Sequence, residues 1–282
     1  MPEEASQDGR FEPLHDAHAI EQMALALHFE GGINESAMLA LRKATDHFKT
    51  DLPGVSDLQT VTLAVGNFPA GVLSSPRAAL GRSYKLTRPD GTVETELRLE
   101  GNVVNYQTTA YTRWVKVWES AWRYLSIVQP IYLASSKLAA VSLNYVDKFH
   151  WLGEPDKYRP SALLRPGSRY ISPHVHGLTD LWHSHTGAYL RPNERTKRLM
   201  NVNLDCLDQQ NAAGEQRRVI QITTVLTDML NQPGYTATDA NAAAAPDFVA
   251  NAFSDLHRFS KELIAEVLND DMCTRIALND PE

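Results

Sequence analysis

The chain has 282 residues, of which 43% are hydrophobic and 22% are charged, and its formal net charge is -7. This balance is typical of a globular protein with a sizeable core, and the negative charge argues against general binding of polyanions. The two cysteines, Cys206 and Cys273, are far apart, which argues against a disulfide scaffold or a cysteine zinc site. The polar N-terminus and the lack of a long apolar run argue against a secretion signal or a membrane span. We therefore expect a soluble, cytoplasmic protein.

The first part of the chain predicts a helix among several strands. Asn34 is a typical N-cap for a helix that runs to about residue 51. Asp90 and Gly91 form a hairpin-turn signal, because both residue types tolerate positive φ. Alternating apolar and polar residues predict five strands, at 19–29, 58–65, 81–87, 92–99 and 103–108. In the fourth of these strands the side chains expected to face solvent are Glu94, Glu96 and Arg98.

Three tryptophans spaced four residues apart indicate a long amphipathic helix that follows these strands. Trp114, Trp118 and Trp122 fall on one broad face, which is the pattern of a helix packed on a core. We interpret them as structural core residues. The alternative is that they wall a ligand cavity. Pro130 is expected to end or kink the helix.

The second part of the chain predicts a strand, an irregular insertion, three more strands and a final helix. The insertion covers residues 150–178 and contains four prolines and three glycines. A linker at 229–245 precedes the final helix, and Pro246 suits the first turn of that helix. The four strands are expected at 138–149, 180–190, 199–207 and 217–228.

These elements predict an α+β fold in which an antiparallel sheet packs on three long helices. Both parts of the chain run through strands into a helix, so we expect two pseudo-repeated halves of the helix-grip type. The expected boundaries are a flexible tail at 1–16, a first half at 17–136 and a second half at 137–278 that carries the insertion.

Four histidines in two H-x-H pairs are the sharpest local signal for chemistry. Strand residues two apart face the same side, so each pair could present two imidazoles to a divalent metal such as zinc. No glutamate stands at the spacing of a general base, and the alternatives are partly solvated loop histidines or a proton switch near neutral pH. The candidate metal ligands are His174, His176, His183 and His185.

A basic segment at 157–198 is a candidate surface for phosphate or nucleic acid. It has few acidic residues, and aromatic side chains are interleaved with the cations. The alternative is a solvated hairpin face with charges spread around it. The candidate contacts are Arg165, Arg169, Arg191, Arg195, Lys197 and Arg198.

Thirteen positions in a fixed order carry a resemblance that covers residues 17–278. Together they resemble a sporadically distributed, uncharacterised prokaryotic protein family known mainly from genome annotation. Asp147 stands where the pattern suggests asparagine, and the segment at 150–178 matches nothing in it. The resemblance implies a defence setting and supplies no catalytic residues. The matching positions are Gly101, Asn102, Asn105, Tyr106, Tyr111, Trp114, Leu143, Tyr145, Val146, Asp147, Leu256, His257 and Phe259.

No complete catalytic motif is present, so we expect a non-enzymatic binding, sensing or adaptor protein, in a setting of prokaryotic anti-phage defence. Its ligand or partner would meet the groove between sheet and helices or the basic segment, and its partner would be encoded nearby or be a second copy. His257 is expected to be a buried, hydrogen-bonded histidine. Two alternatives stay open: a metal-dependent enzyme that uses the four histidines, and a nucleic-acid-binding protein that uses residues 157–198.

Overall fold

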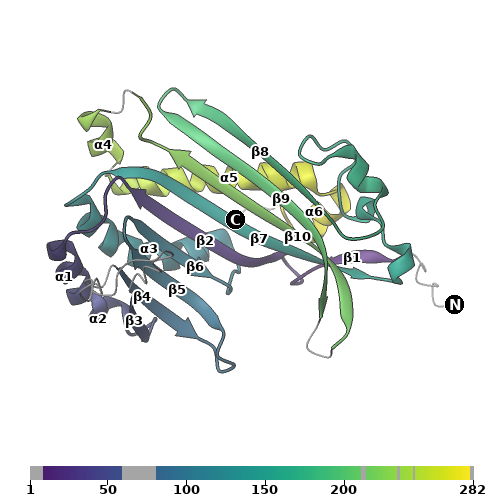
Figure 1. Ribbon diagram of the computed structural model, residues 1–282, viewed down its shortest axis with the longest axis horizontal. Helices are drawn as coiled ribbons and strands as arrows, with labels where there is room; N and C mark the ends of the chain where they lie inside the picture. Colours follow the sequence, from purple (N-terminus) through teal and green to yellow (C-terminus); the bar gives the residue numbers. More distant parts are fainter. Residues whose placement is uncertain (1–8, 59–80, 211–213, 234–235, 244, 280–282) are drawn as a thin grey trace, which may run out of the picture.

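The computed structural model describes residues 9–58, 81–210, 214–233, 236–243 and 245–279. Within these residues, ten strands form one antiparallel sheet (Figure 1). The strands are β1 (Arg10–Pro13), β2 (Ile20–Phe29), β3 (Gly54–Leu58), β4 (Gly81–Thr87), β5 (Val93–Glu100), β6 (Val103–Thr108), β7 (Leu138–Leu152), β8 (Trp182–Asn193), β9 (Thr196–Gln210) and β10 (Gln216–Met229).

The strand order is β3-β4-β5-β6-β2-β7-β10-β9-β8, and β1 also pairs with β7. Short turns join β4 to β5, β5 to β6 and β8 to β9. At the β4–β5 turn Gly91 has a φ of +87°, and the Asp90 carboxylate accepts a 2.9 Å hydrogen bond from the backbone N–H of Thr92. The central pair is different, because β2 and β7 come from distant parts of the chain. Their pairing joins two meanders into one sheet.

The alternation of side chains along β7 shows which face of the sheet is covered by the core. Its side chains alternate between buried and partly exposed along its whole length, as a sheet with one covered face requires. The buried positions include Leu143, Tyr145, Asp147 and Phe149. Asp147 is therefore an acid on the face that otherwise carries apolar and aromatic side chains.

Two helices, α3 (Trp114–Leu133) and α5 (Pro246–Val267), pack on this buried face. Phe29 of β2 stacks on Tyr132 of α3 at 4.7 Å between ring centroids. In Figure 1 the helix α5 lies behind the sheet. The shorter helices are α1 (Glu35–Lys43), α2 (Thr45–Phe48), α4 (Ala237–Ala243) and α6 (Asp270–Arg275).

The predicted fold class, with an α+β sheet packed on three long helices in helix-grip-like halves, is wrong. The described chain is mainly antiparallel sheet, and most of its helices are short. The helix expected from Asn34 to residue 51 begins as predicted, because the Asn34 side chain accepts a 2.8 Å hydrogen bond from the Ala37 N–H. It ends after nine residues, and the four-residue α2 follows it.

Several local predictions also differ from the structure. Glu96 was expected in solvent, but it is 6% exposed and accepts a 2.6 Å hydrogen bond from the Ser83 hydroxyl. Pro130 does not end α3, which continues to Leu133, so of the two predicted effects only a kink stays a prediction. Residues 10–13, in the expected flexible tail, form β1. Most of the strand predicted at 58–65 lies outside the described residues.

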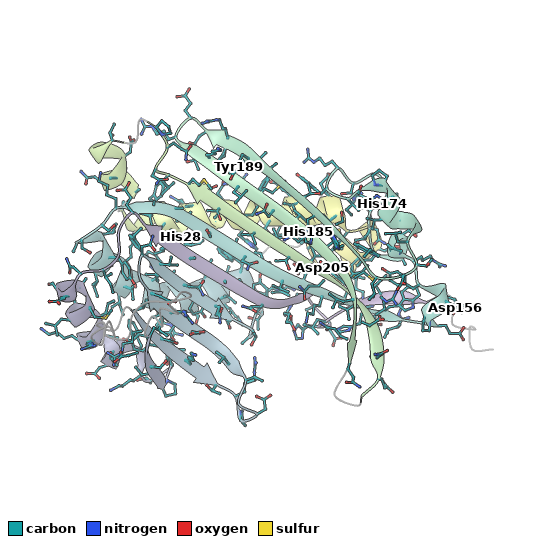
Figure 2. The ribbon with its side chains drawn as sticks, viewed as in Figure 1. His28, Asp156, His174, His185, Tyr189 and Asp205 are labelled. Atoms are coloured by element: carbon teal, nitrogen blue, oxygen red, sulfur yellow. The ribbon has the colours of Figure 1, made fainter. Side chains whose placement is uncertain are left out.

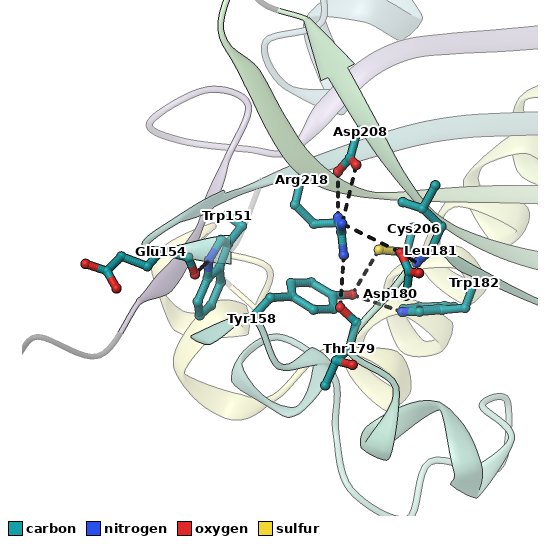
Figure 3. A network of polar contacts seen from close by, with 10 residues as sticks. All are labelled: Trp151, Glu154, Tyr158, Thr179, Asp180, Leu181, Trp182, Cys206, Asp208 and Arg218. Carbon is teal, nitrogen blue, oxygen red and sulfur yellow. Dashed lines mark hydrogen bonds and ion pairs between the residues drawn. The ribbon is translucent and has the colours of Figure 1, made fainter. Parts of the chain in front are cut away.

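The irregular insertion contains three short 3-10 turns, η1 (Pro155–Lys157), η2 (Pro160–Ala162) and η3 (Pro173–Gly177). A polar network around Tyr158 fixes the insertion to the end of the sheet (Figure 3). The Tyr158 hydroxyl accepts a 2.9 Å hydrogen bond from the Trp182 indole and lies 3.0 Å from the Cys206 sulfur. The Arg218 guanidinium lies 5.0 Å from the Tyr158 ring centroid and donates to Asp208 at 2.6 Å.

Candidate ligand-binding site

A cavity of about 70 Å³ lies between β7 and α5. Its wall also includes the segments that precede β2 and α3 and the residues that follow α6. A cavity of this volume holds roughly two to five water molecules, or a molecule of a few non-hydrogen atoms. Its buried or partly buried polar lining consists of His18, Tyr111, Tyr145, Asp147, His257, Ser260 and Lys261.

Asp147 is the most unusual group in this cavity. It is 6% exposed, and burial raises the pKa of its carboxyl group to about 7. Among the described residues, no side chain donates a hydrogen bond to this carboxylate and no basic side chain forms an ion pair with it. An ionised carboxylate in such a place costs several kcal/mol. The group therefore holds a proton near neutral pH or requires a cation from outside the described chain.

His257 is held firmly beside this acid. Its Nδ1 atom lies 2.9 Å from the Tyr145 hydroxyl, and its ring stacks on Trp114 with 4.4 Å between centroids and 4° between planes. His257 is 8% exposed. The prediction of a buried, hydrogen-bonded histidine on the last helix is confirmed. The contacts fix the imidazole in one orientation, so the cavity has a rigid wall on its α5 side.

His18 closes the cavity on the side of β2. Within the described residues its Nδ1 atom is buried without a hydrogen-bond partner, and its ring packs on the Tyr111 ring at 5.3 Å between centroids. Burial, and then the neighbouring His15, lower the pKa of His18. The β2–β7 register shifts between Ile20 and Gln22, opposite Asp147. Such a bulge bends the strand and disrupts its ladder locally.

The rim of the cavity is positively charged. Arg113 is exposed and Lys261 is half-buried, and both line the cavity. Beyond α6, Ala277 has a φ of +51°, a left-handed conformation that is uncommon for alanine. Ala277 also lines the cavity. The tight turn at this position places the last described residues over the site.

Sequence reasoning missed this site as a unit, although it named most of its residues. Tyr111, Trp114, Tyr145, Asp147 and His257 were all among the positions of the family resemblance, but Trp114 was interpreted as core, His257 was expected to be a buried histidine, and the other three had no assigned role. They come from three separate parts of the chain and meet around one cavity. A local signal did exist, because an aspartate occupies an inward-facing position of a strand whose other inward residues are apolar or aromatic.

The four predicted metal ligands do not come together. His183 and His185 are neighbours on β8, with 5.3 Å between ring centroids, but His174 and His176 lie in the separate turn η3. Figure 2 shows His174 in the insertion and His185 in the sheet. In the part of the chain that the structure describes, no group of three His, Cys, Asp or Glu side chains could hold a metal ion. The four-histidine zinc site is therefore not supported.

The six predicted anion contacts are dispersed, and half of them are neutralised. Arg169 and Arg191 are exposed, and the Lys197 ammonium lies 4.1 Å from the Tyr189 ring centroid. A nucleic-acid surface requires cations that are free to meet phosphates. Three of the arginines instead form ion pairs with aspartates: Arg165 with Asp270 at 2.6 Å, Arg195 with Asp239 at 2.6 Å and Arg198 with Asp228 at 2.7 Å.

The three tryptophans form one continuous stack. Trp114 stacks on Trp118 at 5.8 Å, and Trp118 stacks on Trp122 at 5.4 Å. Trp114 is 6% exposed, whereas the other two are partly buried against the core. The stack joins α3 to α5, because Trp118 also contacts Phe253 at 5.5 Å. The tryptophans pack the two helices together, and Trp114 also supports the cavity wall through His257.

No protein-family model, curated protein or solved structure matches this chain. No helix in the described part of the chain is long and apolar enough to cross a membrane. A function is therefore inferred from the geometry of the cavity.

Proposed function

We propose that this protein is a non-enzymatic binding or sensing protein whose ligand occupies the cavity at Asp147. The observation that carries the proposal is the placement of the Asp147 carboxyl group. It borders a cavity from the central strand of the sheet, is 6% exposed, and forms no ion pair within the described residues. Strongly perturbed acids beside a cavity are candidates for functional sites, because a ligand can supply the partner that the fold withholds.

The surrounding groups favour binding over covalent chemistry. The His257 imidazole is occupied on its Nδ1 side by Tyr145 and covered by Trp114. The thiols of Cys206 and Cys273 are buried, and burial raises the pKa of both, so neither has the character of a reactive nucleophile. A rigid wall around one unpaired acid suits recognition of a small ligand.

The biological setting is the part of this proposal that depends on the family resemblance. A sporadically distributed prokaryotic family implies a sensor or adaptor in anti-phage defence, located in the cytoplasm. Four of the resemblance positions, Tyr111, Tyr145, Asp147 and His257, line the cavity, which supports a ligand at this place in the fold. The partner would be a protein encoded nearby or a second copy of this chain, and co-expression with the neighbouring gene products followed by affinity purification tests this part.

Thermal unfolding in the presence of a panel of small metabolites tests the binding function. A ligand present at about 100 times its Kd stabilises a protein by about 2.7 kcal/mol. For a chain of this size such a gain corresponds to a rise in Tm of roughly 5–10 °C. We expect at least one small metabolite to raise the Tm of the wild-type protein by such an amount.

The same panel is applied to two matched variants, Asp147→Asn and Asp156→Asn. Asp156 is exposed in η1, at the insertion end of the molecule (Figure 2), and does not line the cavity, so its substitution controls for the loss of one negative charge. The ligand effect should disappear in Asp147→Asn and persist in Asp156→Asn. An absence of any stabilising metabolite, or an equal effect in both variants, would contradict the proposed function.

A further inference from the structure

We propose that the cavity at Asp147 binds a small zwitterion of the amino-acid type, with a protonated amine, a carboxylate and a short aliphatic part. This inference rests on the proposed function, because it names the ligand class of the same cavity. The ligand amine lies against the Asp147 carboxylate. The ligand carboxylate points to the rim at Arg113.

The ligand amine is inferred from the need of the buried Asp147 carboxylate for a positively charged partner. Asp147 is buried beside the cavity without an ion-pair partner in the described residues, so a ligand cation would remove the cost of the unpaired carboxylate. A charge-assisted hydrogen bond from an ammonium group to a carboxylate is stronger than one between neutral groups. The rings of Tyr111 and Tyr145 line the same space, and aromatic rings attract cations.

The carboxylate is inferred from the opposite charge of the rim. Arg113 is exposed at the cavity edge, and α3 begins directly after it. The first turn of α3 carries no acidic residue and its N-cap side chain makes no capping hydrogen bond. Helix N-termini favour anions because their first N–H groups lack intrahelical partners. A simple amine would be repelled at this rim, and a simple acid would be repelled by ionised Asp147. A zwitterion satisfies both ends.

The volume and the apolar lining limit the rest of the ligand. A space of about 70 Å³ is far below the roughly 300–1,000 Å³ of pockets that enclose drug-sized ligands. Nucleotides and oligosaccharides therefore do not fit as whole molecules. The apolar part of the wall comes from Ile264, Ile276 and Leu278. These side chains suit an aliphatic fragment of one to a few carbon atoms.

Isothermal titration calorimetry at about pH 8, above the titration of Asp147, tests this ligand class. The probes are glycine, L-alanine, L-serine and 4-aminobutyrate, with n-propylamine and propionate as singly charged controls. We expect the best amino acid to bind at least about tenfold more tightly than either control, a difference readily resolved as Kd. Asp147→Asn should weaken that binding by about tenfold or more and Arg113→Gln by about threefold or more, whereas Asp156→Asn should leave it unchanged.

The outcomes separate this inference from the proposed function. Propionate or n-propylamine binding as tightly as the best amino acid would overturn the inference. So would a metabolite without an amine that binds in an Asp147-dependent manner, although the proposed function would then stand. If no metabolite of any class binds, both fail. If Asp147→Asn does not fold, Arg113→Gln decides, because Arg113 is exposed at the surface, and an unchanged affinity would refute the zwitterion.

Discussion

The burial of Asp147 predicts a specific dependence of stability on pH. Burial raises the pKa of this carboxyl group from 3.8 to about 7 in the folded protein. The folded state therefore binds more protons than the unfolded state between these two values, and the free energy of unfolding falls as pH rises through this window. A pKa difference of about three corresponds to about 4 kcal/mol, which is lost in full only above about pH 7.

The Asp147→Asn variant isolates this effect, because asparagine has nearly the same shape and does not titrate. Urea denaturation of the wild-type protein and the variant is measured at about pH 5 and about pH 8.5. About 3 of the expected 4 kcal/mol of lost unfolding free energy falls between these two pH values. We expect the stability of the wild type relative to the variant to decrease by about 3 kcal/mol between these conditions. Histidines outside the cavity are shared by both proteins, so their contribution cancels in the difference, whereas His18 and His257 line the same cavity and are coupled to Asp147.

Asp156→Asn provides the matched control, since Asp156 is exposed and should show the wild-type dependence on pH. The reasoning would be refuted if the wild type and Asp147→Asn kept the same difference in stability, within about 1 kcal/mol, at both pH values. Such a result would mean that the carboxylate is hydrated or paired in solution.

Three further predictions concern the rest of the fold. Arg198→Met should lower the free energy of unfolding by about 3–5 kcal/mol in urea denaturation, because it leaves buried Asp228 unpaired, and a loss below about 1 kcal/mol would be inconsistent with the buried pair. Tyr158→Phe should lower the free energy of unfolding by about 1–3 kcal/mol, because the Trp182 indole loses its hydrogen-bond acceptor. The same substitution should speed amide hydrogen exchange in the insertion. Unchanged exchange would show that the network does not anchor the insertion. Zinc or a chelator should shift the Tm by less than about 1 °C, and a larger rise with zinc would restore the histidine site.

Local patterns in the sequence were sufficient for elements whose cause is local. The alternation over 138–149 predicted a strand with one buried face, and Pro246 predicted the first turn of α5. The helix expected from Asn34 began at the predicted cap but was too long, because its later turns depend on packing against the rest of the fold. The prediction of the fold class was wrong because it also depended on contacts between distant parts of the chain. The pairing of β2 with β7 is a long-range contact that the pattern of either strand alone does not specify.

The histidine pairs show how a correct local rule gave a wrong site. His183 and His185 do share one side of a strand, as their spacing predicted. His174 and His176 have the same spacing but lie in a 3-10 turn within a proline-rich insertion, where the period of two does not apply. A four-ligand site required both pairs to be in strands and adjacent, and the sequence specified neither condition.

The candidate site was only partly accessible to sequence reasoning. The pattern of β7 places Asp147 on the buried face, so a buried acid could have been predicted. Its environment could not, because the Tyr145–His257 pair joins residues 112 positions apart and His18 comes from the distant segment that precedes β2. The groove between sheet and helices was one of the two predicted ligand locations, and the proposed site lies there. The basic segment was the other, and three of its arginines are paired with aspartates.

The most direct test of the central claim is a carboxyl-carbon NMR titration of Asp147 in protein labelled with ¹³C-aspartate, assigned with Asp147→Asn. The account predicts that this carboxyl titrates with a pKa of about 7 in the free protein. In the presence of a saturating amino-acid ligand, the pKa should fall toward its ordinary value, because the ligand amine stabilises the ionised form. A free-protein pKa near 4, or one that no ligand lowers, would contradict the account.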